Sequence, residues 1–235
     1  MGTRGHRLAG TLTAVVTACF AFVGAAAPTT PAAVDYLPLD RRDAQALLRQ
    51  VTQRVMSFGC AAANNGTAVS LDDGTVLTAA HVVTGTRLIN VIPDLGPTTV
   101  ATAEVSPTHD IAVLRQPPSP APAHGIRIAP DDPPAGTHVL VAGYPHGQLS
   151  LVIGSAVIDG QVDGRSVGQS PGPVLRVRTR AATGMSGGPL LDPAGRLAGV
   201  LVATRSGTDE SFAIPASTIR AALAAGVTQP PTGAC

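Results

Sequence analysis

Short runs of apolar and β-branched residues alternate with turn residues from about residue 55 to residue 215. Such runs, bounded by Gly, Pro, Asn and Asp, predict β-strands. In the first half they are Thr67–Ser70, Val76–Ala79, Arg87–Ile92, Thr99–Ser106 and Ile111–Leu114. In the second half they are Val139–Gly143, Leu149–Ile158, Val174–Thr179, Leu190–Asp192, Leu197–Ala203 and Phe212–Ile214. No helical pattern alternates with the runs, so we expect antiparallel barrels or sandwiches.

Helical spacing flanks this β-rich region. Asp40 is a suitable N-cap for a helix that we expect to reach about Arg54, with its apolar positions at Ala44, Leu47, Leu48 and Val51. A closing helix is predicted over Ser217–Ala225. Residues 159–173 lack any periodicity and predict a loop, and Asp72-Asp73-Gly74 predicts a hairpin turn.

Proline divides the β-rich region into two halves. Residues 117–135 are crowded with proline, which cannot lie inside a regular ladder. We therefore expect a first β unit over 55–116, a linker over 117–135, and a second β unit with the closing helix over 136–225. Residues 28–54 form a linker and the first helix, and residues 226–235 form a tail.

Residues 1–27 are typical of an export signal. Arg4 and Arg7 precede an apolar stretch that ends in Gly24-Ala25-Ala26-Ala27, the small residues that a signal peptidase needs. The stretch is about 20 residues long and could span a bilayer if it stayed uncut. We expect a secreted or cell-envelope protein, with a single-span membrane anchor as the alternative.

Composition excludes several classes. Charged residues are 13% of the chain and aromatic residues 3%, which excludes a coiled coil and a charge-driven disordered chain. The formal charge is +1 without a basic cluster, so we expect no nucleic-acid partner. No Gly-rich phosphate loop opens a helix, and His124, His138 and His146 lack metal-ligand spacing. We expect no nucleotide, metal or other cofactor.

Three segments carry side chains suited to nucleophilic catalysis, in the order His, Asp, Ser. His81 follows a buried strand in Thr78-Ala79-Ala80-His81. Asp110 begins an apolar strand, where a carboxylate needs a donor such as an imidazole N–H. A structural histidine and a strand-capping aspartate are the alternatives. The neighbouring His109 is expected to face solvent.

The third segment is Gly184-Met185-Ser186-Gly187-Gly188-Pro189. Its glycines permit a tight turn that exposes the serine hydroxyl and points the N–H groups of Gly184 and Ser186 at one spot. A serine nucleophile needs such donors, together with a base. The alternative is a Gly-Gly-Pro turn between strands.

Together the three motifs resemble those of the chymotrypsin-fold serine proteases over about residues 55–225. Gly143-Tyr144-Pro145 and Phe212-Ala213-Ile214-Pro215 resemble the bacterial HtrA/Deg branch. The position of Cys60 and the ending 226–235 are similar to the protease domains of the mycobacterial acid-resistance (MarP) family. The resemblance implies an all-β fold of two antiparallel six-stranded barrels, with an N-terminal helical segment and a C-terminal helix.

The resemblance also implies a serine endopeptidase that forms an acyl-enzyme on polypeptide substrates. Ser186 would be the nucleophile, His81 the base and Asp110 the group that orients it, with the N–H groups of Gly184 and Ser186 as the oxyanion hole. Met185 replaces the Asp of zymogen-activated relatives, which removes that activation switch. Two alternatives remain: an inactive double-barrel binding protein and an esterase with the same triad. We expect a monomer.

Substrate preference is less determined. By resemblance, Ala182, Thr183, Ala203 and Ala213 line the primary pocket. No Asp stands where trypsin-like proteases keep one, which argues against a strong preference for Arg or Lys. Arg176, Arg178 and Arg180 alternate along one strand and share a face. We favour a solvated face, with a role for Arg180 in binding acidic substrates as the alternative.

Cysteine use agrees with export. Cys19 lies in the signal segment, which leaves Cys60 and Cys235 in a compartment where oxidised pairs persist. We predict a Cys60–Cys235 disulfide, which the resemblance also implies. Two unrelated thiols are the alternative.

Overall fold

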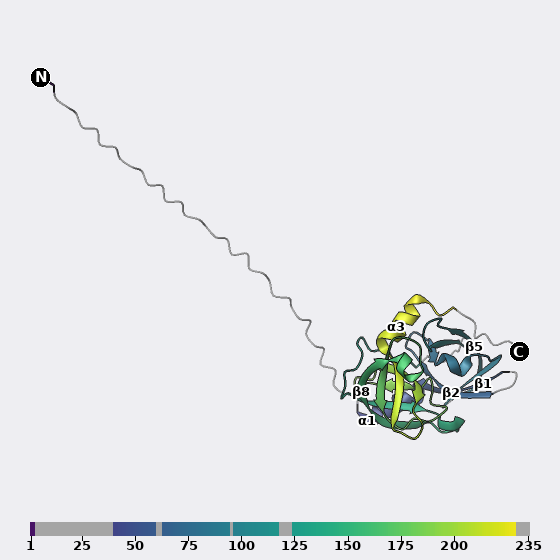
Figure 1. Ribbon diagram of the computed structural model, residues 1–235. Helices are drawn as coiled ribbons and strands as arrows, with labels where there is room; N and C mark the ends of the chain where they lie inside the picture. Colours follow the sequence, from purple (N-terminus) through teal and green to yellow (C-terminus); the bar gives the residue numbers. More distant parts are fainter. Residues whose placement is uncertain (3–39, 60–62, 95, 118–123, 229–235) are drawn as a thin grey trace. The chain divides into compact units, whose positions relative to one another are not determined.

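The computed structural model describes residues 1–2, 40–59, 63–94, 96–117 and 124–228 (Figure 1). Every element below belongs to the unit Tyr36–Cys235. Beyond its first two residues, the predicted export segment lies outside the described residues, as do Cys60 and Cys235. Of the helices in the described ranges, none combines the length and apolar character needed to cross a membrane.

The strands of the described residues form two closed antiparallel barrels (Figure 1). The first has the order β1-β2-β3-β6-β5-β4. Its strands are β1 Thr52–Phe58, β2 Ala63–Ser70, β3 Val76–Thr78, β4 Leu88–Pro93, β5 Thr99–Val105 and β6 Ala112–Arg115. The second has the order β10-β11-β12-β9-β8-β7. Its strands are β7 His138–Gly143, β8 Val152–Asp163, β9 Pro173–Arg178, β10 Pro189–Leu191, β11 Leu197–Thr204 and β12 Glu210–Pro215. The predicted double barrel is confirmed.

Apolar side chains fill each barrel. Leu77 and Leu114 are buried in the first barrel, and Ile158, Leu175 and Leu190 in the second. Burying a side chain of this size stabilises a fold by about 1.5–3 kcal/mol. Each barrel is closed by pairing of the two end strands of its order, β1 with β4 and β10 with β7. Neither barrel therefore leaves a long open edge that could pair with another chain.

The first helix ends earlier than the sequence predicts. Helix α1 spans Arg41–Val51, and Asp40 caps it by accepting a hydrogen bond from the N–H of Arg42 at 2.6 Å. The helix does not reach Arg54, because Thr52 is already extended and begins β1. Strand β1 pairs with both β2 and β4, and these hydrogen bonds hold the residues after Val51 in a strand although the local pattern favours a helix.

Residues 159–173, predicted as a loop, are partly regular. Strand β8 continues to Asp163 along β9, with an irregularity in register between Ile158 and Gly160. The short 3-10 helix η2, Gly164–Val167, follows it. Gly and Asp are depleted in strands, which explains why the sequence predicts a loop where the β9 ladder holds a strand. The C-terminal helix α3 spans Ala216–Ala225, close to its predicted bounds.

Tyr144 joins the two barrels. It follows β7 of the second barrel, is 2% exposed, and packs in a core cluster with residues of the first barrel such as Val55 and Val69. Its hydroxyl donates to the Thr52 carbonyl at 3.4 Å and its N–H donates to Thr67 Oγ1 at 3.1 Å. Burial, together with the smaller effect of the nearby Asp94, raises the pKa of Tyr144 to about 12.

The Tyr144 phenol therefore predicts an alkaline loss of stability. In the unfolded chain it ionises near pH 10, whereas in the folded chain it keeps its proton to about 12. Over that interval the free energy of unfolding falls as pH rises, by ~1.4 kcal/mol per pH unit. Tyr144→Phe should remove this dependence. Urea unfolding of both proteins between about pH 9 and about pH 12 measures this dependence, and two parallel curves would contradict the prediction.

Candidate active site

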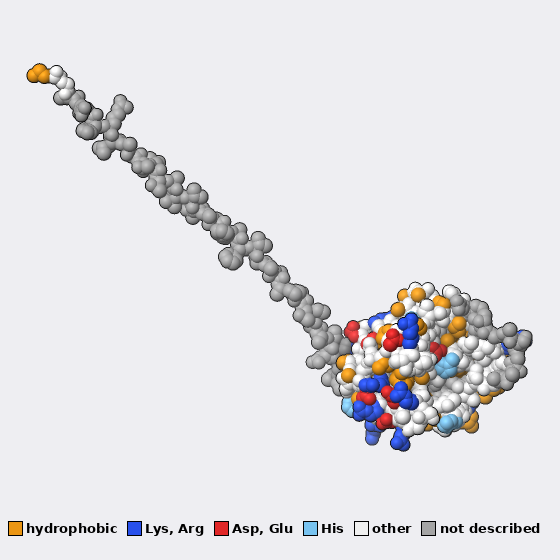
Figure 2. Space-filling model, viewed as in Figure 1, with side chains coloured by type: hydrophobic (Ala, Val, Ile, Leu, Met, Phe, Trp, Pro, Cys, Tyr) orange, Lys and Arg blue, Asp and Glu red, His pale blue; other side chains and the backbone are white. Residues whose placement is uncertain are grey.

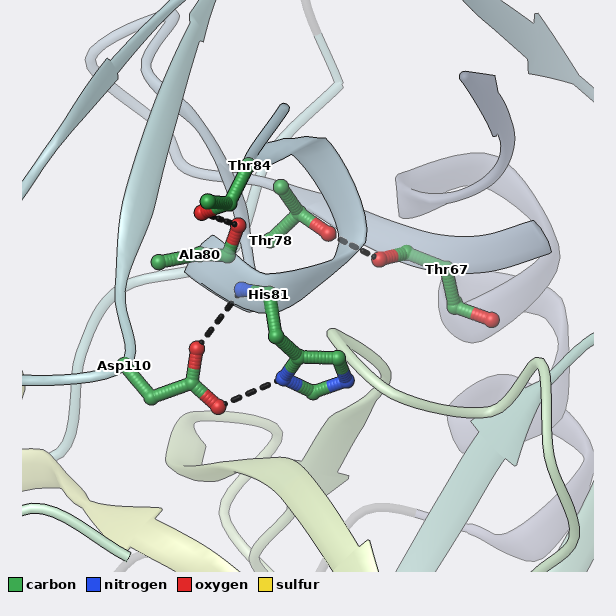
Figure 3. A network of polar contacts seen from close by, with 6 residues as sticks. All are labelled: Thr67, Thr78, Ala80, His81, Thr84 and Asp110. Atoms are coloured by element: carbon green, nitrogen blue, oxygen red, sulfur yellow. Dashed lines mark hydrogen bonds and ion pairs between the residues drawn. The ribbon is translucent and has the colours of Figure 1, made fainter. Parts of the chain in front are cut away.

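His81 lies on the single-turn helix α2, Ala80–Val83, which the sequence does not predict and which follows buried β3. Its N–H donates to Asp110 Oδ1 at 2.8 Å, and its Nδ1 lies 2.6 Å from Asp110 Oδ2 (Figure 3). The histidine side chain is 48% exposed, whereas that of Asp110 is 14% exposed. The carboxylate is thus held inside the rim of the barrel and the ring stands at its surface.

Strand pairing brings these two residues together. They lie 29 positions apart in the sequence, but β3 pairs with β6 and Thr78 lies opposite Ala112. His81 follows the end of β3 and Asp110 precedes the start of β6, so both stand at the same rim. The N–H of Ser106 donates to the Ile111 carbonyl at 2.8 Å, and this hydrogen bond closes the loop that carries Asp110.

The contact sets the tautomer of His81. An ionised carboxylate only accepts hydrogen bonds, so Nδ1 carries the proton in the contact with Asp110. Nε2 then has a free lone pair. The arrangement leaves His81 able to accept a proton at the nitrogen that points away from Asp110.

Ser186 lies in a turn that requires glycine at two positions. Gly184 has φ +95° and Gly187 has φ +88°, conformations that residues with a Cβ rarely adopt. A Cβ on Gly184 would lie 2.5 Å from the Tyr144 carbonyl oxygen, and one on Gly187 would overlap the Thr67 carbonyl. Ser186 is partly exposed, and among the described residues its hydroxyl has no hydrogen-bond partner.

The carbonyl groups of this turn are held by their surroundings. The Thr183 carbonyl accepts from the N–H of His146 at 2.6 Å, and the Met185 carbonyl accepts from the N–H of Gly188 at 2.9 Å. Because a trans peptide points its N–H opposite to its C=O, the N–H groups of Gly184 and Ser186 face away from these contacts. Within the described part of the chain neither N–H has a backbone acceptor, so both are available to an external oxygen.

A cleft of about 660 Å³ lies beside His81 and is lined by both barrels. His81, His109 and Asp110 come from the first barrel, and Gln169 and Val202 come from the second. His109, predicted to face solvent, is only partly exposed and lines the cleft. Apart from Asp110, the cleft residues of loops 106–110 and 168–170 were not predicted as site residues, because loops carry no periodic signal.

The four predicted pocket residues lie on neighbouring segments of the second barrel. Ala182 and Thr183 directly precede the Ser186 turn, whereas Ala203 lies on β11 and buried Ala213 on β12. Thr204 Oγ1 donates to the Ala181 carbonyl at 3.3 Å, which joins the two segments. None of the four is among the residues that line the cleft beside His81.

The arginine face is charge-balanced. Arg176 and Arg178 are exposed on β9 on either side of buried Val177, as predicted, whereas Arg180 lies beyond the end of this strand. Arg178 pairs with Asp159 at 2.5 Å, and Figure 2 shows basic and acidic side chains interspersed over the surface of the second barrel. These contacts agree with a solvated face. In the described ranges, no cluster of three or more His, Cys, Asp or Glu side chains could hold a metal ion.

Comparison with known proteins finds similarity to trypsin-like peptidases. A family model described as a trypsin-like peptidase domain matches residues 64–200. The serine protease Rv3671c of Mycobacterium tuberculosis is 30% identical over 190 residues, which cover 77% of this chain and 47% of that protein. The mitochondrial serine protease HTRA2 of Bos taurus is 34% identical over 154 residues, or 63% of this chain and 33% of that protein. The chain spans about half the length of the first curated relative it matches.

The fold comparison agrees. The crystal structure of the active form of the Rv3671c protease from M. tuberculosis superposes with a TM-score of 0.71 at 27% identity, covering 84% of this chain and 92% of that one. The resemblance to the chymotrypsin-fold serine proteases, and to their HtrA-like and MarP-like members, is therefore confirmed.

The close approach at Gly187 predicts a large cost for any side chain there. Gly136 has almost the same φ, +87°, but open space around it, so Gly136→Ala is the matched control. We expect Gly136→Ala to lower the free energy of unfolding by about 1 kcal/mol through backbone strain alone. Gly187→Ala should cost about 3 kcal/mol or more, because the new Cβ also displaces the Thr67 carbonyl. Urea unfolding measures both, and equal costs would contradict the packing assigned to Gly187.

Proposed function

The chain belongs to the trypsin-like peptidase family, and we propose that it is a serine protease whose catalytic triad is formed by Ser186, His81 and Asp110. The observation that carries the proposal is the pair of hydrogen bonds from His81 to Asp110, at 2.8 and 2.6 Å. Because both the backbone N–H and the ring Nδ1 of His81 bond to Asp110, the ring is held in one orientation, and Nε2 serves as the base.

In the proposed reaction, His81 Nε2 takes the hydroxyl proton of Ser186 as the serine oxygen attacks the carbonyl carbon of the scissile peptide bond. The N–H groups of Gly184 and Ser186 stabilise the oxyanion that forms. The imidazolium, stabilised by Asp110, then gives its proton to the leaving amine, and the C–N bond breaks to leave an acyl-enzyme. Water, deprotonated by His81, releases the acyl group and restores Ser186.

The direction of the Thr183–Gly184 peptide favours this function over an inactive binding protein. Because the Thr183 carbonyl is bonded to His146, the Gly184 N–H is free to serve an oxyanion. A polypeptide substrate would lie in the cleft between the barrels. We propose a preference for small or apolar residues at the scissile bond, because Ala182, Ala203 and Ala213 bring no acid to the primary pocket.

Replacing the proposed nucleophile tests the function. Ser186→Ala should lower kcat by roughly 10⁴-fold or more and leave the melting temperature nearly unchanged, since the hydroxyl has no hydrogen-bond partner in the part of the chain that the structure describes. A fluorophosphonate probe should label the wild-type protein and not the variant. Exposed Ser150 provides a control, and Ser150→Ala should keep both activity and labelling. Full activity of Ser186→Ala would exclude the triad, and hydrolysis of esters without peptides would identify an esterase.

We also propose that the protein is exported, with residues 1–27 removed and Cys60 bonded to Cys235. The charged front, apolar stretch and small residues of the N-terminus support this, as does the pair of cysteines left in the mature chain. N-terminal sequencing of the protein recovered outside the cytoplasm should begin near Pro28. Mass spectrometry without reductant should give a mass lower by two hydrogen atoms than after reduction. An intact N-terminus would indicate an anchor, and two alkylatable thiols would exclude the disulfide.

A further inference from the structure

Thr67 of β2 connects the first barrel to the Ser186 turn of the second. It is fully buried, with 0% exposure. Its Oγ1 donates to the Gly184 carbonyl at 2.8 Å, and its N–H donates to the Ser186 carbonyl at 2.8 Å. We propose that Thr67 is a positioning residue that holds the oxyanion hole in its active arrangement. The proposal rests on the function proposed for Ser186.

The hydroxyl of Thr67 works as both donor and acceptor. While it donates to Gly184, it accepts from the N–H of Tyr144 at 3.1 Å. These two partners lie 117 and 77 residues away in the sequence. One oxygen therefore ties the Ser186 turn to the end of β7, and a side chain without a hydroxyl would leave a buried carbonyl and a buried N–H unpaired.

Thr67 is itself held in place from the strand beside it. Its carbonyl accepts from Thr78 Oγ1 at 2.7 Å, as Figure 3 shows, and Ala68 lies opposite Thr78 in the β2–β3 ladder. Thr78 lies three positions before His81, so one strand pair supports both the His81 helix and the Ser186 turn. The β2–β3 pair thereby holds both the proposed base and the proposed oxyanion donors in place.

Gly184 is the residue whose freedom these bonds remove. A glycine at φ +95° has no Cβ to limit rotation of the peptide groups on either side of it. The Thr183 carbonyl is bonded to His146, and the Gly184 carbonyl is bonded to Thr67. With both flanking carbonyls held, the Gly184 N–H has one direction. Without the Thr67 bond, the Gly184–Met185 peptide keeps only the hydrogen bond from the Met185 N–H to the Ala182 carbonyl, at 3.0 Å.

The His146 contact depends on the same support. His146 has φ +55°, the left-handed region that is costly for a non-glycine residue. Its turn is braced from the first barrel, because Arg54 of β1 donates to the Gly147 carbonyl at 3.1 Å. The Thr67–Tyr144 bond anchors the chain two positions before His146. Strands β1 and β2 thus hold both peptides that flank Gly184.

Since Thr67 touches the turn and not the substrate, its contribution should appear when negative charge develops on the oxyanion. A loss of such a contribution lowers kcat and leaves KM nearly unchanged. We expect Thr67→Val to lower kcat by roughly 10- to 100-fold, somewhat less than removing an oxyanion donor outright. The affinity for a peptidyl boronate, which forms a tetrahedral adduct on Ser186, should fall by the same factor.

Two comparisons separate positioning from general packing. Thr67→Ser keeps the oxygen and loses only a methyl group, so it should retain most of kcat and of the boronate affinity. Thr99→Val makes the same chemical change in the same barrel, where the hydroxyl donates to Gln116 Oε1 at 2.9 Å, and should keep wild-type kcat. The double variant Ser186→Ala, Thr67→Val should bind a substrate peptide as tightly as the single variant Ser186→Ala does.

If Thr67→Val does not fold, Thr67→Cys replaces it, because a thiol is a weaker donor and acceptor of similar size. A folded Thr67→Val or Thr67→Cys protein with wild-type kcat and boronate affinity overturns the proposal. So does a Thr67→Ser protein as impaired as Thr67→Val, since the methyl group would then be what matters. Either result leaves the protease function standing, whereas failure of that function appears as full activity of Ser186→Ala.

Discussion

A closed barrel confines chemistry to its rims. The strands of both barrels are saturated by their neighbours and the interior is filled with side chains, so functional groups stand where strands end. His81 follows β3, Asp110 precedes β6 and the Ser186 turn precedes β10. The pairing of β3 with β6 is therefore the contact that turns two distant segments into one hydrogen-bonded pair.

The barrels meet through polar contacts as well as apolar ones. A shared core cluster contains Val55 and Val69 of the first barrel with Tyr144 and Val200 of the second. Apolar surfaces alone tolerate small shifts, whereas buried hydrogen bonds are lost when partners move by a fraction of an ångström. The hydrogen bonds of Thr67 therefore fix the position of the Ser186 turn against β2. The glycines at 184 and 187 permit the close approach that those hydrogen bonds need.

Local patterns predicted most of the architecture but not its junctions. Alternating runs located most of the strands, and Asp40 marked the start of α1, because both depend on neighbouring residues. Strand β1 was missed because it follows α1 without a turn and is held by β2 and β4. The three motifs pointed to His81, Asp110 and Ser186. Thr67 gave no signal, since a threonine in a strand is ordinary and its partners become visible only in three dimensions.

The sequence separation of the Thr67 contacts has a consequence for biosynthesis. A hydroxyl at position 67 cannot meet a carbonyl 117 positions later until the second barrel has been synthesised and has closed. Contacts that enclose so long a segment form late in folding, because chain entropy opposes them until both halves are compact. We therefore expect the Ser186 turn to become ordered only after both barrels have been synthesised, so that the proposed active site would form late in biosynthesis.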